Sequence, residues 1–95
     1  MYRVIRNDTR LSRDTRFFSL RLKEIDDIFN DQSIQRFQKI SEDGLVRTMT
    51  FIAPSEQNWN NFVNHETFKT KFIVPQNEYN LANNIVYDIV LHETF

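Results

Sequence analysis

The chain of 95 residues contains a single glycine, Gly44, and this glycine directly follows Asp43. An Asp-Gly pair between two extended runs is a strong signal for a β-hairpin, because glycine tolerates the positive φ that tight turns require. The run that follows, Leu45–Ala53, alternates between two sets of side chains and is rich in β-branched residues, as strands are. We therefore predict an antiparallel hairpin in which Ile34–Ser41 and Leu45–Ala53 flank Asp43-Gly44.

The residues before this hairpin predict a strand followed by a helix. Tyr2–Asn7 alternates in the manner of a strand, and the polar residues 8–14 that follow predict a loop. Apolar residues then recur four, three and four positions apart, which is the spacing of one helical face: Phe18, Leu22, Ile25 and Phe29. We expect Ser19 to cap the start of this helix, and Asn30 and Asp31 to end it.

The second half of the chain predicts another helix and a last strand. Pro54-Ser55 stops the hairpin strand and supplies a helix cap. The apolar face of the next helix, interrupted near Asn64-His65, consists of Trp59, Phe62, Val63, Phe68 and Phe72. Pro75 is expected to end this segment, and Glu78–Asn84 to form a further short helical turn. Ile85–Leu91 alternates and closes the chain as a strand.

The predicted order is strand, helix, strand, strand, helix, strand. It indicates one α+β domain over residues 1–95 with the ferredoxin-like βαββαβ arrangement, an antiparallel sheet with both helices on one face. Leu45–Ala53 and Ile85–Leu91 carry apolar residues on both faces, so the second face also needs cover. A second copy packing sheet against sheet would supply it, which predicts a homodimer.

Composition excludes several function classes. The net charge of −1 argues against nucleic-acid binding by the whole domain. The chain has no cysteine, and a lone glycine excludes a Gly-rich phosphate loop. Its two histidines, His65 and His92, stand far apart in sequence, so no metal site is expected. No run is apolar enough to span a membrane or to act as a secretory signal, and we expect a soluble cytoplasmic protein without a cofactor.

Charge is distributed unevenly along the chain. The first third is rich in arginine, whereas the residues beyond Lys71 carry only acidic charges. This asymmetry could bind nucleic acid or an acidic partner, or it could let the two ends attract each other within a dimer. We favour the second interpretation, because the first and last strands are often close in this arrangement.

The second half of the chain resembles the dimeric α+β barrel superfamily, which includes antibiotic-biosynthesis-type and haem-degrading monooxygenases. The likeness lies in Phe51–Phe62, where a strand ends, a serine opens a helix and two aromatic residues stand three positions apart. It continues in Phe68-Lys69 and in the last strand, Val86–Val90. The resemblance implies a dimeric α+β barrel built from two ferredoxin-like domains, and it says far more about fold than about function.

The haem-degrading members use an asparagine, a tryptophan and a histidine. Asn7 could match the asparagine, but Phe62 and Phe72 stand where the tryptophan and the histidine belong. Phenylalanine cannot bind iron, and a shifted alignment that uses Trp59 and His65 breaks the rest of the match. Haem degradation is therefore not expected.

The chain also resembles small uncharacterised phage proteins of similar length. The shared features are Arg6-Asn7, Phe17-Phe18, Ser41–Gly44 and Tyr79–Asn83. This likeness implies a viral origin, and then a location in the host cytoplasm, but it implies no activity.

From these observations we expect a non-catalytic viral or accessory protein that acts through homodimerisation and protein binding. The alternative is a cofactor-free monooxygenase-like or isomerase-like enzyme that acts on a small apolar ligand. For that alternative, the residues expected to line a pocket are Asn7, Phe18, Phe51, Trp59, Phe62 and Phe72, with Arg6, Asn7 and Trp59 at its mouth. No catalytic residue and no metal ligand is predicted.

Overall fold

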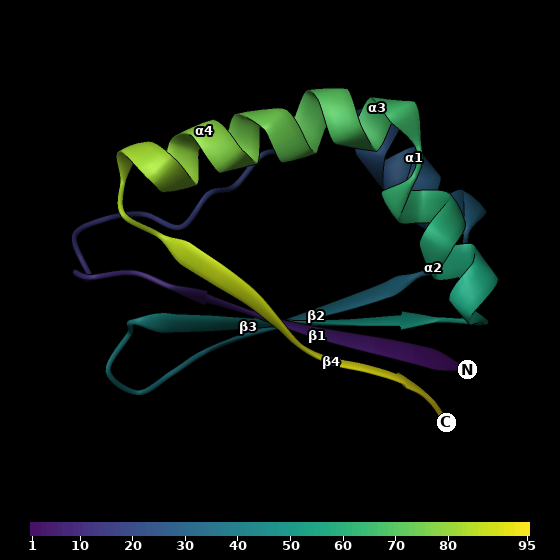
Figure 1. The fold of residues 1–95 in the computed structure, drawn as a ribbon, viewed down its shortest axis with the longest axis horizontal. Helices are drawn as coiled ribbons and strands as arrows, with labels where there is room; N and C mark the ends of the chain where they lie inside the picture. The colour runs from purple at the N-terminus through teal and green to yellow at the C-terminus, as the bar shows by residue number, and fades with distance from the viewer.

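The computed structural model describes every residue from Met1 to Phe95, and its helices and strands are drawn in Figure 1. The four strands are β1 (Tyr2–Thr9), β2 (Gln35–Ile40), β3 (Val46–Ala53) and β4 (Val86–Thr94). The helical segments are α1 (Lys23–Asp31), α2 (Glu56–Val63), α3 (Glu66–Phe68), the π-helical turn η1 (Lys69–Ile73) and α4 (Val74–Ala82).

The strands form one sheet in the order β2-β3-β1-β4, and all neighbouring strands are antiparallel. The predicted hairpin around Asp43-Gly44 is confirmed as the β2–β3 pair. Gly44 has a φ of 75°, and Ser41 donates its N–H to the carbonyl of Val46 at 2.9 Å. The chain is thus an α+β protein with an antiparallel sheet, as the sequence predicted.

The helices cover only one face of this sheet (Figure 1). On that face, β1 places Tyr2, Val4 and Asp8, all of which are buried. The opposite face of the same strand presents Ile5 and Asn7, which are half-buried. Strand alternation therefore assigns the residues of β1 to two different environments, one under the helices and one outside.

The hydrophobic core occupies the end of the sheet where β1 begins. Phe62 lies at its centre, with ring centroids 4.2 Å from Phe29 and 4.1 Å from Phe68. The other buried members are Tyr2, Val4, Ile25, Ile28, Ile34, Ala53 and Trp59. Aromatic rings dominate this cluster because each one buries a large apolar area.

The start of the first helix differs from the prediction. Helix α1 begins at Lys23 after Leu22, and no side chain caps it, so Ser19 is not its cap. Phe18 lies in the irregular segment before the helix. Its carbonyl accepts a hydrogen bond from Arg47 Nη1 of the sheet at 2.9 Å. This carbonyl therefore does not accept the hydrogen bond that a helix beginning at Ser19 would require.

Pro75 does not end the second helical region. It stands in the first turn of α4, directly after the π-helical turn η1. Proline lacks an N–H and its ring clashes with the preceding turn of a regular α-helix. A wider π turn gives that ring room. The helix therefore continues through Pro75 to Ala82, and it contains most of the short turn predicted at Glu78–Asn84. The predicted break near Asn64-His65 and the Ser55 cap are both confirmed.

The two ends of the chain lie together. Strand β4 pairs with β1 along its length, with a bulge opposite Ile5 and Arg6. The N-terminal ammonium of Met1 donates to the carbonyl of Phe95 at 2.9 Å, and Arg3 forms an ion pair with Glu93. The basic first strand thus contacts the acidic last strand within one chain.

Candidate functional site

A cavity of about 560 Å³ lies between the helix-facing side of the sheet and the helices. All four strands, all helical segments and the loop before α1 contribute to its lining, and 14 of the 24 lining residues are hydrophobic. The core fills only one end of the sheet, whereas the other end carries charged side chains on the same face. The cavity lies between these two ends, because core rings such as Phe62 and charged side chains such as Arg47 both line it.

Five of the six predicted pocket residues surround this cavity: Phe18, Phe51, Trp59, Phe62 and Phe72. Arg6, which we expected at its mouth, also lines it. Asn7 does not, because alternation turns it to the opposite face of β1, where it accepts a hydrogen bond from the Thr48 hydroxyl at 2.8 Å. Trp59 is buried and does not stand at the mouth.

The cavity is bounded on the sheet side by a buried charge cluster of Arg6, Asp8 and Arg47. Asp8, only 1% exposed, accepts hydrogen bonds from Arg6 Nε at 2.9 Å and from Arg47 Nε and Nη2 at 3.0 and 2.7 Å. The two arginine side chains are each 12% exposed. Two guanidinium groups share one carboxylate, so the cluster retains one unbalanced positive charge away from solvent.

Sequence analysis missed this cluster, because it placed Asp8 in a loop beyond the first strand. The detectable signal is the alternation itself. Extending β1 by two residues puts Arg6 and Asp8 on the inward face, and β3 places Arg47 directly opposite Asp8. Charged residues on the inward face of neighbouring strands are unusual, and they indicate either a mutual ion pair or a ligand site.

The helix side of the cavity contributes a buried amide. Gln76 of α4 is 2% exposed, lines the cavity, and its Nε2 has no hydrogen-bond acceptor. Arg6 Nη2 is also buried without a hydrogen bond, although it lies 2.8 Å from Asp8 Oδ1. The helix wall therefore offers one buried donor without an acceptor, Gln76 Nε2, whereas Arg6 Nη2 on the sheet wall already faces the Asp8 carboxylate.

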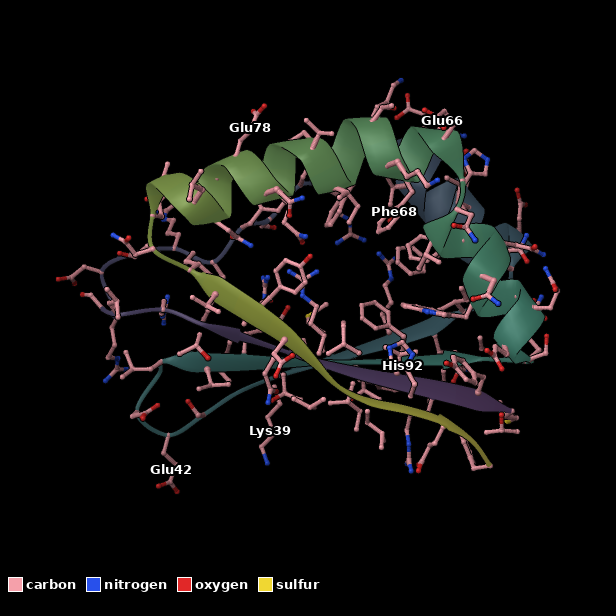
Figure 2. All side chains as sticks on the ribbon, in the orientation of Figure 1. Lys39, Glu42, Glu66, Phe68, Glu78 and His92 are labelled. Atoms are coloured by element: carbon pink, nitrogen blue, oxygen red, sulfur yellow. The ribbon has the colours of Figure 1, made fainter.

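Aromatic side chains form the apolar part of the wall. Phe18 contacts Phe72 edge to face, with centroids 5.4 Å apart, and Phe68 stacks on Phe72 at the same separation. Figure 2 shows Phe68 on the side of the helices that faces the sheet, whereas Glu66 and Glu78 point away. The Tyr79 hydroxyl donates to the carbonyl of Arg16 at 2.6 Å, which fixes the loop before α1 against α4.

His92 lies on β4 and faces the same space (Figure 2). Its Nδ1 is 2.9 Å from the hydroxyl of Tyr2. Burial, and then the nearby carboxylate of Glu56, raise the pKa of Tyr2 above its usual range, so this phenol stays protonated at neutral pH. No group of three or more His, Cys, Asp or Glu side chains is placed to hold a metal ion.

Comparison with known proteins adds no relative: no protein family, no curated protein and no solved structure matches this chain. None of its helices is both long and apolar enough to cross a membrane.

Proposed function

We propose that this chain is a small non-catalytic viral or accessory protein that acts as a homodimer and presents the dimer to another protein. The observation that carries this proposal is the uncovered face of the sheet. One row across that face consists of Phe37, Thr50, Ile5 and Leu91, which the strand registers place side by side. Phe37 is 53% exposed, and no helix lies over this face (Figure 1).

We further propose that the fold is ferredoxin-like and that the dimer is an α+β barrel. The support is the strand–helix–strand–strand–helix–strand order, the antiparallel pairing of all neighbours, and the helices confined to one face. Two such sheets packed face to face would give each apolar face the cover that it lacks alone.

A second copy suits this face in charge and in area. Its two charged rows each carry one positive and one negative residue, Arg3 with Glu93 and Lys39 with Asp88, so the face has no net charge and two identical faces would not repel each other. Four strands about 4.8 Å apart, each about eight residues long at about 3.3 Å per residue, present roughly 500 Å². Two faces would bury about 1,000 Å², which is the lower limit for a specific interface.

Light scattering over a dilution series tests the dimer. The wild-type chain should show twice its 11.5 kDa mass, and Leu91→Asp should show the monomer mass, because it places a charge in the proposed interface. The matched control is Leu81→Asp, which makes the same change at a residue of α4 that is 85% exposed. It should remain dimeric. A wild-type monomer at all concentrations, or a Leu91→Asp dimer, contradicts the proposal.

The cavity favours a second candidate, a cofactor-free enzyme of monooxygenase or isomerase type that acts on a small ligand. Its volume lies within the range of small-molecule sites. Turnover of flat aromatic substrates by the purified protein would support this candidate. Binding without turnover would leave the cavity a binding site only.

A further inference from the structure

We propose that the cavity binds a small organic anion with a flat aromatic body, of the aromatic carboxylate class. The proposal goes beyond the dimer and does not depend on it. It rests on three observations about the same cavity: an unbalanced buried positive charge, an unpaired buried amide donor on the helix wall, and an aromatic lining.

The first observation is electrostatic. Arg6 and Arg47 share the single carboxylate of Asp8, and all three side chains border the cavity. A buried charge without a counter-ion is costly, and the cost falls when an ion of opposite sign binds beside it. Arg21, Arg36 and Asp26 also line the cavity, so its lining is net positive and favours a negatively charged ligand.

The second observation concerns hydrogen bonds. Gln76 Nε2 on α4 is a buried donor without an acceptor, whereas Arg6 on β1 is a buried guanidinium that shares the Asp8 carboxylate with Arg47. Leaving a buried donor unpaired costs more than a hydrogen bond normally contributes. A carboxylate is an acceptor-only group with two oxygens, so a carboxylate ligand offers an acceptor of the kind that Gln76 Nε2 lacks and the negative charge that the two arginines attract. Bonds from a guanidinium to a carboxylate are among the stronger ones in proteins.

The third observation is the shape of the wall. Phe18, Phe68 and Phe72 pack against one another through T-shaped and stacked contacts and line the cavity. Such rings favour a flat apolar body. The cavity is reachable along β4, where the lining residues Tyr87 and Ile89 are 41% and 37% exposed. A ligand can thus enter from the sheet edge with its charged end toward Arg6.

Isothermal titration calorimetry with 2-naphthoate tests this proposal, and 2-naphthamide is the uncharged control with the same ring system. We expect one equivalent of 2-naphthoate per chain, bound at least about tenfold more tightly than the amide, because the charge adds a charge-assisted hydrogen bond. The chain has one tryptophan. Its indole N–H signal in a nitrogen–proton correlation spectrum should therefore shift on binding, since Trp59 lines the cavity.

Two variants locate the anion. Arg6→Met should weaken 2-naphthoate binding by about tenfold and leave 2-naphthamide binding nearly unchanged, while Asp8 keeps its pair with Arg47. Gln76→Leu should weaken binding by about threefold to tenfold. The same change should raise the melting temperature of the free protein, because it removes an unpaired buried amide. Arg16→Met removes one positive charge outside the cavity and should leave binding unchanged.

Equal affinity for the carboxylate and the amide overturns the proposal, as does undiminished binding by Arg6→Met. Absence of saturable 2-naphthoate binding by folded wild-type protein also overturns it. These outcomes are separate from the oligomeric state, which light scattering measures independently. A monomer that binds 2-naphthoate contradicts only the dimer, and a dimer that does not bind it contradicts only the anion site.

Discussion

Two residues other than glycine take a positive φ, and both end a helix. Ser33 and Asn84 each have a φ of 55°. The residue after each is a buried isoleucine: Ile34 donates its N–H to the carbonyl of Phe29, and Ile85 donates to the carbonyl of Asn80, both at 2.9 Å. This is the Schellman arrangement, in which a left-handed residue lets the chain turn back and satisfy the last carbonyls of the helix.

Of the two, Ser33 has the less favourable backbone conformation, because serine adopts the left-handed region less readily than asparagine does. Ser33→Gly should therefore stabilise the protein by about 0.5–1 kcal/mol, as measured by urea unfolding. The contrasting control is Glu78→Gly, on the exposed side of α4. It should lower the unfolding free energy of the protein by up to about 1 kcal/mol. A loss of stability in Ser33→Gly would show that the turn does not depend on this φ.

At the scale of elements, the β2–β3 hairpin is organised by one carboxylate. Asp43 accepts a hydrogen bond from the Ser41 hydroxyl at 2.6 Å and from the N–H of Leu45 at 3.0 Å. These two bonds, the Ser41 bond first, hold the pKa of Asp43 below its usual range. Because the folded pKa is lowered, the ionised form stabilises the hairpin above the usual pKa of an aspartate, and this contribution is lost as pH falls through the folded pKa.

Asp43→Ala should accordingly lower the melting temperature at neutral pH by a few degrees. The difference from the wild type should shrink as pH falls from about 5 to about 2, where the carboxylate becomes protonated. The control is Glu42→Ala, which removes the neighbouring exposed carboxylate. Asp43, not Glu42, accepts the hydrogen bonds of the turn, so this variant should leave the melting temperature nearly unchanged. A melting-temperature difference between Asp43→Ala and the wild type that stays constant with pH would contradict the stabilisation of the turn by the ionised carboxylate.

On the scale of the whole molecule, the space between sheet and helices has a packed end and a hollow end. Phe62 is 1% exposed and lies among Phe29, Trp59 and Phe68 at the packed end. Phe72 is half-buried, so other side chains cover less of its ring, although both rings border the cavity. The two side chains are identical. The difference in unfolding free energy between their alanine variants therefore measures how much more the packing around Phe62 contributes to stability than the packing around Phe72.

Phe62→Ala should cost about 3–5 kcal/mol of unfolding free energy, because it empties a closely packed site. Phe72→Ala should cost about 1–2 kcal/mol, since part of that ring already faces open space. Chemical denaturation of both variants gives the comparison, and the larger loss is severe for a domain of this size. Equal losses would mean that the hollow end is packed as tightly as the core.

The sequence alone determined the features that depend on local chemistry. The Asp43-Gly44 turn, the alternation of the strands, the Ser55 cap and the break before His65 follow from rules that act over a few residues, and all are present in the fold. The same rules identified five aromatic residues that surround the cavity, because large rings at helical or strand spacing point inward.

Tertiary structure decided what depends on distant partners. The helix start moved from Ser19 to Lys23 while Arg47, far away in sequence, holds the carbonyl of Phe18. Asp8 became a buried strand residue because β3 places Arg47 opposite it. Gln76 became an unpaired buried amide only once α4 lay over the sheet. Pairing, burial and desolvation are set by residues that folding brings together, and no local pattern contains them.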